Sequence, residues 1–403
     1  MNLLFDFITV QKKTGAGEYQ RKVFFSLMDY IASNSLDINL YALFDSTKGI
    51  AYEDLKPHSI PYKINFIDIA NENIISIIQK YNIDKFFIAC AQYIGNYQHI
   101  NNLKCNIVCI IHDLAYEELY ENNLNIYFQL ENPYLKFNES NINGWQAYVK
   151  GPYIRFCKWL LKMMSQDKFR QRTNSMRIIS SLVKKNNKVS IITVSEYTKY
   201  TLSYHYKIPL DKIQVLYSPE RISIKSQEIQ NKELNELISS NKKFYLMVSA
   251  DREAKNPKKL VTAAKHFIEE HPSDFFVTIG YPFKEFKNHL ILPFLSESDL
   301  EWAYSHCYAL IYPSYFEGFG YPPVEAMKYS KPILASNTTS IPEILGKAPI
   351  YFSPLYCSDI YKALCSLTNE SYPTLAKLSK EQYELIHKKQ SRDLATLITI
   401  LLS

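Results

Sequence analysis

Residues 309–354 read ALIYPSYFEGFGYPPVEAMKYSKPILASNTTSIPEILGKAPIYFSP. Three short apolar runs in this stretch, Ala309–Ser314, Pro332–Ser336 and Pro349–Ser353, have the length and composition of buried strands, and a helical segment separates the first two. Alternation of strand and helix is typical of a parallel sheet covered by helices. The stretch therefore predicts an α/β fold.

Two glutamates eight positions apart stand at the centre of this stretch. Glu317 is on the turn after the first strand, and Glu325 is expected in the first turn of the next helix, which Pro322 and Pro323 introduce. Both then lie at the carboxyl end of the strand, where open α/β sheets bind ligands. There the Glu325 carboxylate could accept hydrogen bonds from the vicinal hydroxyls of a ribose, and Glu317 would face the rest of the ligand. Taken singly, each also fits a plainer interpretation, a helix-terminal glutamate and a solvated loop acid.

The turn between the two glutamates holds two glycines. Gly318 and Gly320 flank Phe319, and glycine allows both a close backbone approach and dihedral angles that other residues avoid. The peptide N–H groups of these three residues could therefore reach a polyhydroxyl or phosphate group. The chain has only ten glycines, so their placement here is informative.

A second glycine turn occurs near the start of the chain. A buried-strand pattern over Leu3–Val10 is followed by a loop with Gly15 and Gly17, and then by an amphipathic helix to about Ala32. A strand, a glycine loop and a helix form a turn that can face phosphate or sugar. The pattern lacks the third glycine and the downstream acid of a dinucleotide fingerprint, so a tight connection remains an alternative.

Two further groups are placed at strand ends. His112 closes the apolar strand Ile107–Leu114, and Arg252 and Lys255 lie three residues apart after the strand Phe244–Ala250. Cations beside a helix N-terminus can hold a diphosphate and stabilise its charge as it leaves. The plainer alternatives are a structural histidine and a solvated basic loop.

The motif Glu317–Glu325 resembles the Glu-x7-Glu signature of retaining glycosyltransferases of family 4, which have the GT-B fold. The strands and loops after it are also similar to that family. So is the sequence TVSE at residues 193–196, which follows two isoleucines. The resemblance implies two Rossmann-like domains with parallel sheets facing a central cleft. Arg252 departs from it, because many members carry the arginine where this chain has Ala250.

The resemblance also implies roles for the residues above. Glu325 would hold the ribose of a nucleotide-diphosphate sugar. Glu317 and the amides of the glycine turn would hold the sugar hydroxyls, and His112 would contact the sugar from the opposite domain. Arg252 and Lys255 would hold the diphosphate, with Gly15 and Gly17 closing on the phosphates. His112, Arg252, Lys255 and Glu317 are the expected catalytic residues.

The chain is expected to divide into four parts. Residues 1–218 form a first Rossmann-like domain on the acceptor side, with an insertion at about 115–188. A polar linker covers 219–240, a nucleotide-sugar-binding domain covers 241–385, and a final helix over 386–403 crosses back to the first domain. The length of 403 residues fits two domains of this kind.

Composition restricts the function and location. With 47% hydrophobic and 21% charged residues the chain is globular, and a net charge of +6 favours a small anionic ligand or a membrane surface over nucleic acid. Its seven cysteines form no CxxC pair and read as reduced thiols of a cytoplasmic protein, without a signal peptide. No Asp-x-Asp sequence and no zinc-spaced His/Cys cluster occurs, so we expect no metal or other cofactor.

A basic segment precedes the second half of the first domain. From Arg155 to Lys188 there are ten Lys and Arg against one acid, and aromatic residues flank them. Within residues 152–188 this pattern suits contact with anionic lipid at the inner face of the cytoplasmic membrane, or a core-packing helix with a solvated basic edge.

The expected function is transfer of a hexose from a GDP- or UDP-sugar to a glycan or lipid-linked acceptor in bacterial surface polysaccharide synthesis, with retention and without metal. A nucleotide-sugar epimerase or phosphorylase of the same fold stays open. So does a catalytically silent sugar-nucleotide-binding partner of a polysaccharide assembly complex.

Overall fold

The structure is a computed structural model that describes residues 1–8, 15–48, 64–91, 100–115, 117–118, 177–183, 188–222 and 228–403. The start of the first glycine loop, at 9–14, lies outside the described residues. Most of the predicted insertion, including the basic segment over 152–176, lies outside them as well. Residues 177–183 are helical.

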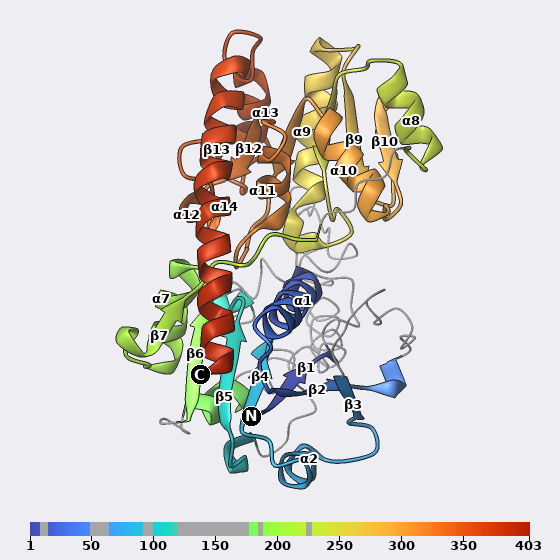
Figure 1. Cartoon of the computed structure of the whole chain (residues 1–403). Helices are drawn as coiled ribbons and strands as arrows, with labels where there is room; N and C mark the ends of the chain where they lie inside the picture. Colours follow the sequence, from blue (N-terminus) through green and yellow to red (C-terminus); the bar gives the residue numbers. More distant parts are fainter. Residues whose placement is uncertain are drawn as a thin grey trace, which may run out of the picture.

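The described residues form two parallel β-sheets, each the centre of one domain (Figure 1). The first sheet has the order β3-β2-β1-β4-β5-β6-β7, and the second has β10-β9-β8-β11-β12-β13. The strands of the first are β1 Asn2–Asp6, β2 Asn39–Phe44, β3 Ile64–Asp68, β4 Lys85–Ile88, β5 Asn106–Ile111, β6 Val189–Thr193 and β7 Ile213–Val215. Those of the second are β8 Phe244–Met247, β9 Phe275–Ile279, β10 His289–Leu292, β11 Ala309–Tyr312, β12 Ile333–Ser336 and β13 Ile350–Phe352. The strands predicted over 309–354 are therefore present, each one or two residues shorter.

The two sheets reverse strand order at the same place, beside their first strands. In each, the chain builds outward from β1 or β8 in one direction and then returns to continue on the other side. This double winding places a crevice at the carboxyl ends of the strands, and ligands of open α/β sheets bind there. The two domains are Rossmann-like, as the alternating pattern predicted.

Helices cover both sheets. In the first domain these are α1 Gly15–Ser33, α2 Ile74–Lys80 and α7 Glu196–Tyr206. In the second they are α8 Lys232–Ser239, α9 Pro257–Glu270, α10 Glu297–His306, α11 Tyr321–Met327, α12 Ile341–Leu345, α13 Cys357–Ser366 and α14 Tyr372–Leu402. Among the described residues, no helix combines the length and the apolar character needed to cross a bilayer.

The connections between the domains differ from the predicted boundaries. The predicted linker 219–240 contains α8, which buries Leu234 and Leu237 and packs against α10 of the second domain. Polarity alone suggested a linker because this helix is amphipathic and exposes most of its surface. The predicted final helix over 386–403 is the second half of α14, which begins at Tyr372 and runs alongside both domains (Figure 1).

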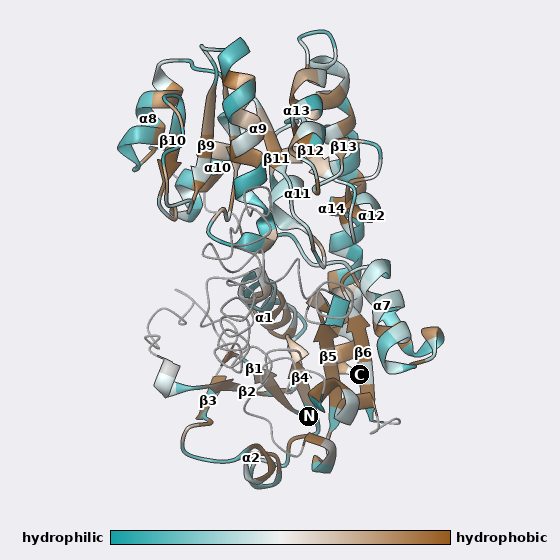
Figure 2. Cartoon of the chain, turned by 180° about the vertical axis from the view of Figure 1, so that it is seen from behind, coloured by the Kyte–Doolittle hydropathy of each residue, from teal (hydrophilic) through white to brown (hydrophobic). Residues whose placement is uncertain are grey.

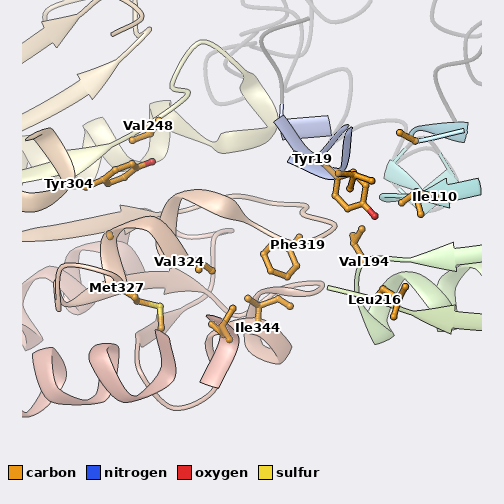
Figure 3. Close-up of a cluster of buried hydrophobic side chains, with 14 of the residues drawn as sticks. Tyr19, Ile110, Val194, Leu216, Val248, Tyr304, Phe319, Val324, Met327 and Ile344 are labelled. Atoms are coloured by element: carbon orange, nitrogen blue, oxygen red, sulfur yellow. The ribbon is translucent and has the colours of Figure 1, made fainter. Parts of the chain in front are cut away.

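One hydrophobic cluster joins the domains. Hydrophobic residues concentrate on the strands and on the inner faces of the helices (Figure 2). The largest buried cluster runs from Tyr19 and Val194 of the first domain to Phe319 and Val324 of the second, with Leu397 of α14 (Figure 3). Because apolar surface of both domains is buried in the same cluster, separating them would expose it to water.

Glu343 adds a polar connection between the domains. Its carboxylate lies on α12 of the second domain and accepts hydrogen bonds from the backbone N–H groups of Glu196 (2.8 Å) and Tyr197 (2.9 Å) at the start of α7. The hydroxyl of Tyr217 donates to the same carboxylate at 3.1 Å. The first N–H groups of a helix have no partner within the helix, and the helix dipole favours a negative charge there. Glu343 therefore caps a helix of the opposite domain.

We expect Glu343→Gln to loosen this connection. The amide has one acceptor oxygen and no charge, so the variant should lose about 1–2 kcal/mol of unfolding free energy. Hydrogen exchange at the start of α7 should accelerate. Exchange followed by mass spectrometry and urea unfolding would measure both effects.

Glu269→Gln is the matched control. Glu269 is an exposed helical glutamate of the second domain, paired only with exposed His266 among the described residues. Its substitution should change stability by less than about 0.5 kcal/mol. Unaltered exchange at the start of α7 in Glu343→Gln would show that the cap contributes nothing to domain association.

Candidate functional site

The two predicted halves of the site meet at Gly318. A Cβ atom added to this glycine would lie 2.9 Å from the carbonyl carbon of His112, nearer still to its oxygen, and 3.1 Å from Cβ of Asp113. Real Cβ atoms do not approach other atoms this closely, so only glycine fits. The turn after β11 in the second domain thus lies directly against the residues after β5 in the first. The approach of Gly318 to a ligand stays a prediction, and the structure adds a close approach to the chain itself.

Lys255 and Glu317 form a buried ion pair beside this contact. The Nζ of Lys255 donates a short hydrogen bond to Oε1 of Glu317 and a second one, at 3.3 Å, to the hydroxyl of Tyr312. Burial lowers the pKa of Lys255, and the charge of Glu317 opposes that effect. Burial alone would raise the pKa of Glu317, but the charge and hydrogen bond of Lys255 hold it below its ordinary value. Each group thus favours the charged form of the other.

Neighbouring loops fix this pair. Asn256 has a left-handed backbone (φ 60°), and its side-chain amide donates to the carbonyls of Pro313 (3.2 Å) and Pro354 (2.9 Å). The Glu317 N–H donates to the Thr339 hydroxyl at 3.1 Å, and the Ser340 hydroxyl donates to the Glu317 carbonyl at 2.9 Å. Sequence analysis did not find these supporting residues, since isolated Asn, Thr and Ser carry no spacing signal.

His112 is neutral and held in one orientation. Its Nε2 lies 2.8 Å from the carbonyl oxygen of Ala89, at the end of β4, so that nitrogen carries the proton. The ring meets Tyr19 edge-on, with centroids 4.8 Å apart. Burial lowers the pKa of His112 to about 4. At neutral pH the imidazole is therefore uncharged.

Asp113 belongs to the same site, although sequence analysis gave it no role of its own. Burial, together with the neighbouring charges of Glu317 and Glu117, raises its pKa to about 6, although the Ala115 hydrogen bond and the charge of Lys255 act in the opposite direction. Its Oδ1 accepts a hydrogen bond from the Ala115 N–H at 3.1 Å. A carboxyl group that titrates near neutral pH thus lies where the two domains meet.

Glu325 is placed differently from the prediction. The helix α11 begins at Tyr321, directly after Gly320 (φ 91°), so Glu325 lies beyond its first turn. Its Oε1 pairs with Nη1 of Arg221 at 3.0 Å. The prolines of the motif suggested a later helix start, because a proline is common at the first helical position. A side chain from the interdomain connection, and not the helix terminus, balances the charge of Glu325.

The remaining predicted residues line the same region. Gly15, at the start of α1, would place a Cβ 3.5 Å from the ring of Tyr321, so the two glycine turns face each other across the domains. Gly17 is buried two residues further along α1. Phe319 is buried in the shared cluster and contacts the ring of Tyr217 edge-on (centroids 5.5 Å apart).

Arg252 is exposed at the start of the loop that carries Lys255, and its charge contributes to lowering the pKa of Lys255. The two cations lie three residues apart on one loop, and their joint binding of a diphosphate stays a prediction. Within the part of the chain that the structure describes, no three His, Cys, Asp or Glu side chains are grouped closely enough to hold a metal ion.

Comparison with solved structures identifies the architecture. An Anabaena protein, Alr3699/HepE, solved in complex with UDP-glucose, aligns over 100% of this chain and 98% of its own with a TM-score of 0.64 and 14% identity. WaaG, a glycosyltransferase involved in lipopolysaccharide biosynthesis, aligns over 98% of both chains with a TM-score of 0.58 and 11% identity. The fold is GT-B. At this identity the likeness extends to the fold alone.

Sequence comparison adds a domain and several relatives. Residues 228–349 match the family model Glycosyl transferases group 1. The matched range of this chain includes Lys255, Glu317 and Glu325 but not His112. O-antigen chain mannosyltransferase RfbU of Salmonella typhimurium is 28% identical over 174 residues, 41% of this chain and 46% of the relative. O-antigen chain mannosyltransferase B of Escherichia coli is 40% identical over 63 residues, 16% of each chain. The matches span less than half of these relatives.

We expect a double-mutant cycle to detect the coupling of Lys255 and Glu317. Removing one partner leaves a buried charge, so Lys255→Met or Glu317→Gln should each cost about 3–5 kcal/mol of unfolding free energy. The double variant should cost clearly less than the sum. Urea unfolding at pH 7 measures the three values.

The cycle also has a pH dependence. Because the pKa of Glu317 is lowered in the folded state, its stabilisation is complete above the ordinary glutamate pKa and is lost as the pH falls through the folded value. Additive costs within about 0.5 kcal/mol would show that the two side chains do not interact.

His112 should titrate near pH 4 rather than near the ordinary value of about 6.5. The expected result is an imidazole with a proton on Nε2 throughout pH 5.5–8, because burial disfavours the charged ring. Nitrogen and ring-proton chemical shifts of selectively labelled protein would report this. A midpoint between pH 6 and 7 would contradict the buried placement.

Proposed function

We propose that this protein is a glycosyltransferase that moves a hexose from a nucleotide-diphosphate donor to a glycan or lipid-linked acceptor in the synthesis of a bacterial surface polysaccharide. The observation that carries the proposal is the contact of Gly318 with His112 and Asp113. It brings the buried Lys255–Glu317 pair of one domain against a strand end of the other, at the crevice where a GT-B fold takes its ligand.

The relatives support the reaction class. The matched group 1 domain and the O-antigen mannosyltransferases of Salmonella and Escherichia coli favour glycosyl transfer and a mannose-like sugar. The structural neighbour HepE was solved with UDP-glucose, so guanosine and uridine donors both enter the test. Membership of retaining family 4 is our proposal, from the resemblance of the Glu317–Glu325 motif.

Charge explains how the site would act. Lys255, with Arg252 nearby, would bind the diphosphate and stabilise the charge that develops as the sugar leaves. Glu317 fixes the Lys255 ammonium and would accept sugar hydroxyls. The amides of the Gly318–Gly320 turn and the His112 ring would contact the sugar, and the Gly15–Gly17 turn the phosphates. A leaving phosphate that takes the proton of the acceptor hydroxyl on the same face would give retention.

Two properties of the proposed enzyme are independent of the acceptor. Fixed cations would neutralise the diphosphate, so we propose that no divalent metal is required. We also propose that the protein works in the cytoplasm, at the inner face of the membrane where lipid-linked acceptors are built.

We expect GDP or UDP to raise the thermal unfolding midpoint in the presence of EDTA. At 100 times its dissociation constant a ligand stabilises by about 2.7 kcal/mol. Lys255→Met and Glu325→Ala should weaken binding at least tenfold and abolish transfer from GDP-mannose or UDP-glucose, with circular dichroism as the check on folding. Retained transfer in either variant, or a loss of activity in EDTA, would contradict the assignment.

The same experiment separates the alternatives. Donor incubated without acceptor should stay chemically unchanged apart from slow hydrolysis, whereas an epimerase would yield an epimerised sugar and a phosphorylase, given phosphate, a sugar phosphate. NMR of the product with acceptor would give its anomeric configuration. A protein that binds neither nucleotide would instead favour a catalytically silent partner.

A further inference from the structure

The connection between the two domains is held residue by residue. Successive residues from 217 to 221 each have a partner on α11 or α14, helices that pack against one another. Three residues have partners on α14: the Tyr217 N–H with Asp393 (2.9 Å), the Ser218 carbonyl with Gln390 (2.6 Å), and Glu220 with Tyr383 (2.9 Å) and His387 (3.1 Å). Two have partners on α11: the Pro219 carbonyl with the Tyr321 hydroxyl (3.1 Å) and Arg221 with Glu325 (3.0 Å). Arg221 therefore reaches Glu325 from a fixed backbone.

The Arg221–Glu325 pair is largely shielded from water. The side chains are 25% and 15% exposed, and the hydrogen bond runs from Nη1 to Oε1. Burial opposes the charge of Arg221, but the Glu325 carboxylate raises the pKa of the guanidinium overall. An ion pair in such a place costs desolvation of both partners, and stability alone is a weak reason for it. A role in ligand binding would be a second reason for the Arg221–Glu325 pair.

The second oxygen of Glu325 shows what that role is. Oε2 is buried and completes no hydrogen bond with the described residues, while Oε1 is held by Arg221. The buried Tyr304 hydroxyl, which also completes no hydrogen bond, lies next to this carboxylate and is the protein group nearest to filling that place. Buried carboxylate oxygens are normally paired, so an unpaired one calls for an explanation. Hydrogen bonds to a charged acceptor are stronger than those between neutral groups. A ligand hydroxyl that donated to Oε2 would form such a bond.

We propose that Arg221 is a positioning residue: it holds Glu325 through Oε1, so that Oε2 is presented to the vicinal hydroxyls of a nucleoside ribose. The inference rests on the proposed function, which assigns the ribose to Glu325, and it adds the group that orients that carboxylate. Arginine suits the task because its planar guanidinium fixes a carboxylate in direction, whereas lysine offers a single rotating charge.

Arg221 also connects the ribose site to the other domain. The negative charge of Glu18, on α1 of the first domain, contributes to raising the pKa of Arg221. The guanidinium is therefore influenced by one acid from each domain.

The test compares ribose with a sugar that lacks the two hydroxyls. Dissociation constants of GDP and UDP and of their 2′,3′-dideoxy forms are measured by calorimetry for wild type, Arg221→Gln, Arg221→Lys and Glu325→Gln. Wild type should bind the ribose form at least about tenfold more tightly, the value of a hydrogen bond to a charged group. Arg221→Gln should lose most of that preference while its affinity for the dideoxy form changes less than about twofold. Arg221→Lys should lie between the two.

Lys328→Gln is the control for loss of a positive charge. Lys328 lines the same hollow as Arg221 and Glu325 but pairs with Glu301 at 3.3 Å. Its substitution should leave the ribose preference intact. Binding of the dideoxy form also shows that each variant is folded, and Arg221→Lys provides the comparison if Arg221→Gln does not fold.

Two outcomes separate the inference from the function beneath it. If Glu325→Gln loses the ribose preference and Arg221→Gln keeps it, or if Arg221→Gln weakens both forms equally, Arg221 does not position Glu325 and the proposed function stands. If wild type itself does not distinguish ribose from dideoxyribose, or binds neither nucleotide, the ribose role of Glu325 is wrong and the inference ends with it.

Discussion

The close approach of Gly318 to the backbone of His112 and Asp113 is the constraint on which the site depends. Two sheets that each end in a loop could face one another at many distances, and any side chain at position 318 would hold them apart. With glycine there, the turn after β11 lies against the turn after β5. A neutral histidine, a carboxyl group and an acid–lysine pair are thereby enclosed in one crevice.

Several weaker interactions maintain that approach. The shared hydrophobic cluster through Tyr19 and Phe319 makes separation of the domains costly, and Glu343 caps a helix on the other side of the interface. The helix α14 follows both domains, and the Lys85 ammonium donates to the carbonyl of Ile400 near its end (2.7 Å). Apart from Phe319, these contacts lie outside the Gly318–Gly320 turn, so most of the contacts that hold the domains together are separate from it.

The two glutamates of the motif are distinguished by their cations. Glu317 is paired with Lys255 of its own domain, in a buried setting where the charge of Lys255 lowers the pKa of Glu317. Glu325 is paired with Arg221, which comes from the connection between the domains. The spacing of eight residues thus places one acid on a rigid loop and the other beside the connection.

The sequence by itself determined the local elements: apolar runs of strand length gave β11, β12 and β13, and Gly320 marked a backbone turn that occurs at φ 91°. It also brought His112, Lys255 and Glu317 to strand ends, because parallel strands share an edge. Only the tertiary structure decided what each group meets. The partner of Glu325 and the atoms facing Gly318 depend on residues distant in the chain, and neither periodicity nor spacing records which distant side chain will arrive.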